Sequence, residues 1–144
     1  MRAVGFKKFG DPEVLEVMDI PEVFAGPGEI RIRNYASAVN PTDIVSRSGL
    51  ISQFRKDFPL PSVPGMDISG IVDQVGEGVE TDISIGDKVM GMVIPNELHG
   101  AYREQITLNQ FAVVKAPEGY SFAESSTSVS YTHLRAHETP EHLV

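Results

Sequence analysis

Short apolar runs separated by glycine and proline are the feature of this sequence that most limits its fold. Its 144 residues include 13 glycines and 10 prolines, and no apolar pattern with the helical period extends over a long segment. Runs of strand length that are rich in β-branched residues and spaced by turns are typical of a β-barrel or β-sandwich. The sequence therefore predicts a mainly β fold that carries one or two short helices.

The expected strands follow one another along the chain. Residues 2–9 and 14–20 are two β-rich runs joined by a Gly-Asp-Pro-Glu turn, which predicts an opening hairpin. Further strands are expected at 30–39, 66–75, 88–93, 101–108 and 111–115. Gly70 lies inside one of these runs, where glycine marks a bulge or a close approach of two backbones. Residues 58–65 contain three prolines, so we expect a surface arm or a rigid lead-in there.

Sequence signals mark both ends of one short helix. Asn40 is a favoured N-cap, Pro41 suits the first helical position, and Gly49 suits the left-handed residue that ends a helix. Asp43 falls in the first turn, where a carboxylate stabilises the positive end of the helix dipole. Arg47 lies four residues later, which predicts an ion pair with Asp43 on one face of the helix.

A second helix start is expected near the C-terminal end of the sequence. Ser121 and Glu124 have the spacing of a capping box, which marks the beginning of a helix. The serine- and threonine-rich residues that follow give this helix no apolar continuation. We therefore expect it to begin without an apolar face to bury.

Composition excludes several classes of function. The sequence has no cysteine, so zinc would have to be held by its 4 histidines and its carboxylates. The formal net charge of −8 is spread along the chain, which argues against a nucleic-acid partner. No apolar run approaches the roughly 20 residues of a membrane span, and the N-terminus has no signal-peptide core. We therefore expect a cytoplasmic protein with no membrane partner.

Glycine motifs give no support to nucleotide binding by this segment. Gly76 and Gly78 could open a dinucleotide fingerprint, but the third glycine would fall at Thr81, where no helix begins. The sequence contains neither a Gly-x-Ser-x-Gly elbow nor a lysine-bearing phosphate loop. We therefore expect an ordinary turn at Gly76–Gly78.

A histidine-rich tail could in principle bind a metal ion. His133 and His137 would share one face of a helix, and the further possible ligands are His142, Glu138 and Glu141. Pro140 interrupts that helix, and a set of ligands without a rigid frame is weak support for a metal site. We predict no metal site. His99, next to Gly100, is expected to be a solvated loop residue.

Asn40 has two interpretations. Its amide offers two donors and an acceptor near a helix N-terminus, which suits a nicotinamide carboxamide or an enone oxygen that gains charge during hydride transfer. Capping alone also explains asparagine at this position, and composition by itself favours the cap. The same alternatives apply to Asp43.

Seven short motifs occur in a fixed order along the sequence. They are Gly10-Asp11-Pro12-Glu13-Val14-Leu15-Glu16, Gly28-Glu29-Ile30, Asn40-Pro41-Thr42-Asp43 with Arg47-Ser48-Gly49, Val63-Pro64-Gly65-Met66-Asp67 with Gly70, Val75-Gly76-Glu77-Gly78-Val79, Gly86-Asp87-Lys88-Val89, and Gly100-Ala101-Tyr102 with Glu104-Gln105. Together, and in this order, they resemble the medium-chain dehydrogenase/reductase superfamily, and in particular its zinc-independent quinone oxidoreductases. The resemblance implies a GroES-like catalytic domain, which is a partly open β-barrel with short helices.

The resemblance also bears on zinc. In the zinc alcohol dehydrogenases of this superfamily, a cysteine ligand stands at the position of Asn40 and a histidine ligand at that of Met66. The lobe that binds structural zinc would fall at 92–100, where this sequence has a short loop without cysteine. The resemblance therefore implies the metal-free branch, in which NADPH delivers hydride to a quinone or another electron-poor alkene.

The resemblance assigns roles to five residues. Asn40 would lie beside the nicotinamide and the substrate, and Thr42 would join it in binding the cofactor. Asp43 and Arg47 would support Asn40, and Asp67 matches an acidic position that shapes the cleft. Some quinone oxidoreductases have tyrosines where this sequence has Val45 and Ile51, so the choice of quinone or enone stays open.

The resemblance also defines the expected domain organisation. Residues 1–128 are expected to form the GroES-like catalytic domain, whereas 129–144 no longer resemble the family and are expected to be a foreign or disordered tail. The doubly wound nucleotide-binding domain that should follow Ser121 is missing from this sequence, so we expect the chain to be inactive alone. The full-length protein is a possible homodimer. The alternative function is a stand-alone GroES-like interaction module without catalysis.

Overall fold

The structure is a computed structural model that describes residues 1–129. Within this range the strands are β1 (Arg2–Gly5), β2 (Glu16–Asp19), β3 (Glu29–Ala36), β4 (Asp67–Val75), β5 (Lys88–Met92), β6 (Gln105–Asn109) and β7 (Val113–Lys115). The α-helices are α1 (Pro41–Ser48) and α2 (Phe122–Thr127), and the 3-10 helices are η1 (Pro12–Val14), η2 (Leu50–Gln53) and η3 (Gln110–Ala112). The mainly β prediction is confirmed.

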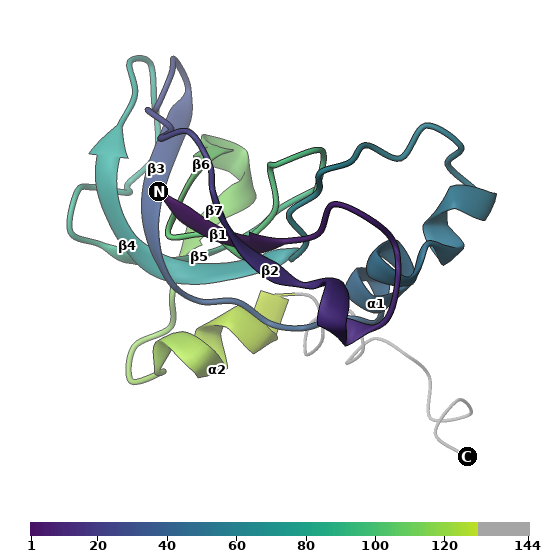
Figure 1. Cartoon of the computed structure of the whole chain (residues 1–144). Helices are drawn as coiled ribbons and strands as arrows, with labels where there is room; N and C mark the ends of the chain where they lie inside the picture. The colour runs from purple at the N-terminus through teal and green to yellow at the C-terminus, as the bar shows by residue number, and fades with distance from the viewer. Residues whose placement is uncertain (130–144) are drawn as a thin grey trace.

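The strands form two antiparallel sheets (Figure 1). β1 and β2 pair as the expected hairpin, and the larger sheet has the order β6-β3-β4-β5-β7. Its edge strands β6 and β7 do not pair with each other, so the barrel stays open. All strand pairs within residues 1–129 are antiparallel, so this range holds no doubly wound parallel sheet. No helix in this range has the length and apolar character of a membrane span.

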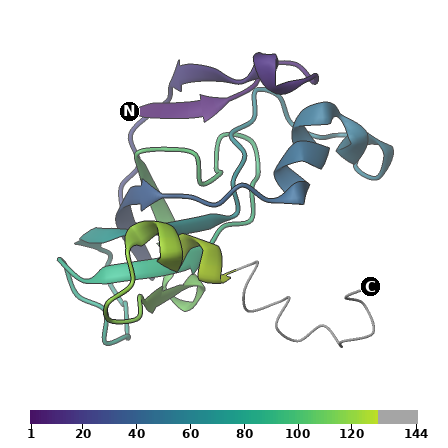
Figure 2. The same cartoon turned by 90° about the horizontal axis from the view of Figure 1, so that it is seen from below.

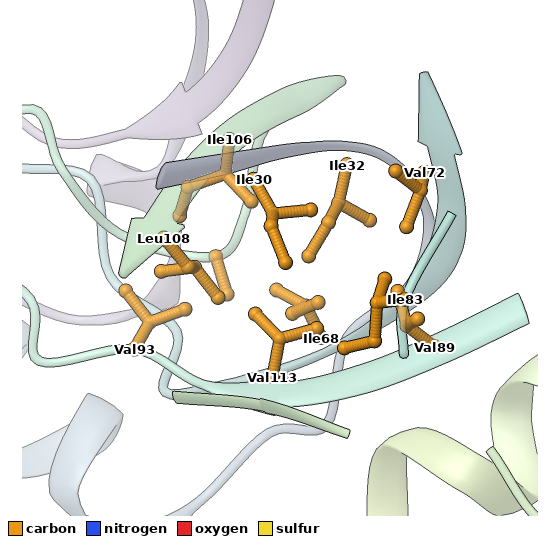
Figure 3. Packing of buried hydrophobic residues seen from close by; sticks show 11 residues of the cluster. Ile30, Ile32, Ile68, Val72, Ile83, Val89, Val93, Ile106, Leu108 and Val113 are labelled. Carbon is orange, nitrogen blue, oxygen red and sulfur yellow. The ribbon is translucent and has the colours of Figure 1, made fainter. Parts of the chain in front are cut away.

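Aliphatic side chains from all five strands of the larger sheet fill the open barrel (Figure 3). Side chains of β3 alternate between buried and partly exposed at its start, so that Ile30 and Ile32 point inward. They meet Ile68 and Val72 of β4 and Ile106 of β6, all nearly or fully buried. Each such side chain contributes about 1.5–3 kcal/mol by leaving water. This core gives the ends of β3 and β4 a rigid support.

The pairing of β3 with β4 becomes irregular where β3 leaves the sheet. The register shifts between Asn34 and Ala36, opposite Ser69 and Gly70. A Cβ atom at Gly70 would lie 2.1 Å from the carbonyl oxygen of Arg33, which confirms the predicted close approach of two backbones. The chain then continues from Ala36 to α1, which both views place to one side of the sheets (Figures 1 and 2).

The second half of the proline-rich segment is a rigid lead-in, whereas Leu60 and Pro61 before it are exposed. Residues 62–65 are buried, and Ser62 pairs with Phe6 through two backbone hydrogen bonds of 2.9 Å. Phe58 also stacks on Phe6, with ring centroids 6.4 Å apart. The segment therefore delivers the start of β4 at a fixed place, because its backbone is hydrogen-bonded on the way.

Three expectations about the C-terminal half are corrected. The strand expected at 111–115 begins only at Val113, because Gln110–Ala112 form the 3-10 helix η3. The strand expected at 101–108 begins only at Gln105, since 101–104 run as an irregular segment. α2 does have a face to bury: Ser125 and Ser126 are buried, and the ring of Phe122 stacks on Tyr35 at 4.6 Å. α2 packs on β3, β4 and β5, and Figure 2 shows it across the strands. Small polar side chains achieve this burial because a close helix–sheet contact needs little volume.

Candidate functional site

The N-terminus of α1 is the centre of the candidate site. The helix has the predicted bounds, with Asn40 as N-cap in an extended conformation and Gly49 as C-cap at φ +87°. Thr42, in its first turn, is exposed, whereas Asn40 retains only 7% of its surface. The helix therefore presents a buried amide at its positive end.

Asn40 makes a contact that capping does not require. Its Nδ2 atom donates a hydrogen bond of 2.7 Å to Oδ2 of Asp67, the fully buried first residue of β4. Hydrogen bonds to a carboxylate are about twice as strong as neutral ones. The pair joins two residues 27 positions apart in the sequence and fixes the plane of the Asn40 amide.

Asp43 turns into the protein instead of facing Arg47. Its Oδ2 accepts from the backbone N–H of Asn40 at 2.8 Å, and its Oδ1 accepts from the N–H of Gly65 at 2.8 Å. The expected Asp43–Arg47 ion pair is wrong, because no such pair occurs among the ion pairs of residues 1–129. Arg47 donates to the carbonyl of Gly10 in the hairpin turn, away from Asn40. The structure therefore brings together Asn40, Asp43 and Asp67, but not Arg47.

Tyr102 is a member of this cluster that the sequence did not reveal. Its hydroxyl group lies 3.2 Å from Oδ2 of Asp43. Burial raises the pKa of Tyr102 above its ordinary value, and the Asp43 carboxylate raises it further through its charge and its hydrogen bond. The only sequence signal was the Gly-Ala-Tyr motif, which says nothing about a partner 59 residues away.

The raised pKa of Tyr102 predicts a loss of stability at high pH. The folded state favours the neutral phenol, so its contribution is complete below pH 10 and is lost as the pH rises above the pKa of about 10 in the unfolded chain. From pH 9 to 11 the free energy of unfolding should fall by about 1 kcal/mol more in the parent than in Tyr102→Phe. Urea unfolding followed by circular dichroism measures the free energy of unfolding of the parent and of the variant at each pH. The same pH dependence in the two proteins would contradict the prediction.

The positions that would match zinc ligands hold an amide and a thioether. The Sδ atom of Met66 accepts a hydrogen bond of 3.0 Å from Oγ1 of Thr42. Within residues 1–129 no three histidine, aspartate or glutamate side chains gather closely enough to hold a metal ion. The possible ligands of the tail, from His133 onward, lie outside the described residues.

His99 is half-buried, whereas a solvated loop residue was expected. Burial lowers the pKa of His99, and the charge of Arg103 lowers it further.

A hollow of about 510 Å³ lies beside Asn40. Its walls are the segment that joins β3 to α1 and one face of α2, namely Ala36, Ser37, Ala38, Val39, Asn40, Ala123, Ser126 and Thr127. A hollow with small side chains and one buried amide can receive a planar ring that carries a carboxamide. The residues present therefore fit the nicotinamide end of a cofactor.

The geometry agrees with the comparisons with known proteins. Residues 26–123 match the family described as the alcohol dehydrogenase GroES-like domain. This chain belongs to that family. This chain is 34% identical over 128 residues to a quinone oxidoreductase of Pseudomonas aeruginosa, a match that covers 87% of this chain and 36% of the relative.

Solved structures show the same fold. A quinone oxidoreductase of Escherichia coli in complex with NADPH has a TM-score of 0.73 at 30% identity, over 89% of this chain and 37% of that protein. An NAD-dependent alcohol dehydrogenase has a TM-score of 0.80 at 35% identity, over 88% of this chain and 43% of that protein. This chain thus spans less than half the length of each of these relatives. Its quinone oxidoreductase-like membership of the medium-chain superfamily is confirmed.

Proposed function

We propose that this GroES-like domain is the catalytic part of an NADPH-dependent, zinc-independent oxidoreductase that reduces a quinone or another electron-poor alkene. The observation that carries the proposal is the buried Asn40–Asp67 hydrogen bond beside the hollow. The quinone oxidoreductases among the relatives, one of them in complex with NADPH, support the class of reaction and the cofactor.

Asn40 would act by stabilising charge. When bound, NADPH supplies a hydride, and an oxygen of the substrate gains negative charge as the hydride arrives. The Nδ2 atom of Asn40 carries two hydrogens. It donates one in the hydrogen bond to Asp67, so the other can be donated to an oxygen in the hollow. A donor fixed before the reaction stabilises developing charge without first having to reorganise. Asp67 is therefore a positioning residue in this proposal.

Zinc independence follows in this proposal from the chemistry of two side chains. An asparagine amide at residue 40 and a thioether at residue 66 replace the cysteine and histidine that the zinc enzymes of the superfamily use there. Zinc prefers thiolate, imidazole and carboxylate ligands. Moreover, the amide and the thioether are already engaged, with Asp67 and Thr42 respectively.

A chimera tests the proposal. Residues 1–128 of this chain would replace the matching segment of the Pseudomonas aeruginosa quinone oxidoreductase, and oxidation of NADPH would be followed with 1,4-benzoquinone and with an aliphatic enone. We expect oxidation that depends on one of these acceptors and survives treatment with a chelator. The 144-residue chain alone should show none, because hydride transfer needs the cofactor held against the substrate.

The outcomes separate the candidate functions. A folded chimera that is inactive with every quinone and enone would contradict the proposal and favour the non-catalytic interaction module. Activity that is lost to a chelator and restored by zinc would contradict zinc independence alone. We also propose a homodimer for the full-length protein, which size-exclusion chromatography of that protein tests.

A further inference from the structure

Tyr102 joins the segments that build the candidate site. Its backbone N–H donates to the carbonyl of Pro64 at 3.0 Å, and its own carbonyl accepts from Val4 of β1 at 2.8 Å. Its ring lies against Gly65, where a Cβ atom would come within 2.6 Å of the ring atom Cδ1. The backbone and the ring therefore fix Tyr102 without any help from its hydroxyl group.

The hydroxyl group reaches the residues on either side of Asn40. Its oxygen lies 3.3 Å from the carbonyl oxygen of Ala38 and 3.2 Å from Oδ2 of Asp43. A tyrosine hydroxyl has one hydrogen, so it donates to one of these acceptors at a time or is shared between them. Either bond holds the turn that contains Asn40, because one acceptor precedes that residue and the other follows it.

The Asp43 oxygen passes this restraint on to Asn40. Oδ2 of Asp43 accepts from the backbone N–H of Asn40 as well as from the Tyr102 hydroxyl. Oδ1 of the same carboxylate accepts from Gly65, two residues before Asp67. The buried Asp43 carboxylate thus fixes the distance between two backbone segments. The side chains of these segments, Asn40 and Asp67, meet at 2.7 Å.

We propose that Tyr102 is a positioning residue whose hydroxyl group, through Asp43, holds the Asn40 amide against Asp67. The proposal rests on the proposed function only for the role of Asn40 in the reaction. The hydrogen bonds that hold Asn40 in place are a property of this chain. A purely structural tyrosine would act through its ring, which packs on Gly65. The two roles separate when the hydroxyl is removed and the ring is kept.

The test is Tyr102→Phe in the isotopically labelled 144-residue chain, with hydrogen exchange at Nδ2 of Asn40 followed by NMR. We expect a shifted side-chain amide signal and exchange about tenfold faster than in the parent, relative to the backbone amide of Ile32 in the core. Division by the core amide removes any general loss of stability, because a global opening speeds both sites alike. Tyr120→Phe is the matched control, since Tyr120 is about half exposed and lies outside the Asn40 cluster, and it should change neither value.

Asp43→Asn is the second variant, for use if Tyr102→Phe fails to fold, and should produce the same change at Asn40. An unchanged Asn40 signal and exchange ratio in the folded variant would overturn the proposal. This readout involves neither cofactor nor substrate. An inactive chimera with a changed Asn40 signal would therefore reject the proposed function and leave the positioning role intact. An active chimera with an unchanged Asn40 signal would reject the positioning role and leave the proposed function intact.

Discussion

Replacing Asn40 with alanine should lower kcat/KM of the chimera for NADPH oxidation, with whichever acceptor it uses, by a factor of about 10²–10³. Removal of one preorganised donor from an oxyanion site typically has this effect, because the donor acts where water is excluded. Asn40 is buried and already oriented by Asp67, so its remaining N–H meets that condition. The absorbance of NADPH, followed in the steady state or by stopped flow, gives kcat and KM.

Ser48→Ala is the matched control for this loss of activity. Ser48 is exposed at the far end of α1, and its hydroxyl donates to the carbonyl of Val45 within the same helix. The control should stay within twofold of the parent. If Asn40→Ala and Ser48→Ala behaved alike in folded chimeras, Asn40 would be only a helix cap.

Local signals were sufficient for α1 because each signal acts within a few residues. A favoured N-cap, a proline at the first position and a glycine at the end determine where the helix begins and ends without any tertiary contact. The structure accordingly reproduces these bounds, with Gly49 in the left-handed conformation. The turn at Gly78 was predictable for the same reason. A glycine inside a strand predicted the close approach at Gly70, but not that its partner is Arg33 of β3.

The contacts of the candidate site were not predictable from local patterns. Spacing placed Asp43 and Arg47 on one face of a helix, but the Gly65 N–H and the Tyr102 hydroxyl attract the carboxylate inward. A buried carboxylate that accepts several hydrogen bonds outweighs an exposed ion pair, which contributes only a few tenths of a kcal/mol. The resemblance pointed to Asn40 and Asp67 one by one, and only the fold shows that they touch.

Asn40→Ala and Asp67→Ala should each destabilise the 144-residue chain by about 2–4 kcal/mol. Loss of Asn40 leaves a buried carboxylate without one of its donors, and loss of Asp67 leaves a buried amide hydrogen without its acceptor. Urea unfolding at pH 7 followed by circular dichroism measures both losses. Glu118→Ala, on an exposed loop, is the control and should stay within about 0.5 kcal/mol of the parent.

The interaction energy between Asn40 and Asp67 is the most direct test that the two side chains form one unit. It is obtained from the free energies of unfolding of the parent, the two single variants and the double variant. We predict that the double variant loses about 1–3 kcal/mol less free energy of unfolding than the two single variants lose together. Additive losses within about 0.3 kcal/mol would contradict the account, because residues that share a buried charged hydrogen bond cannot act independently.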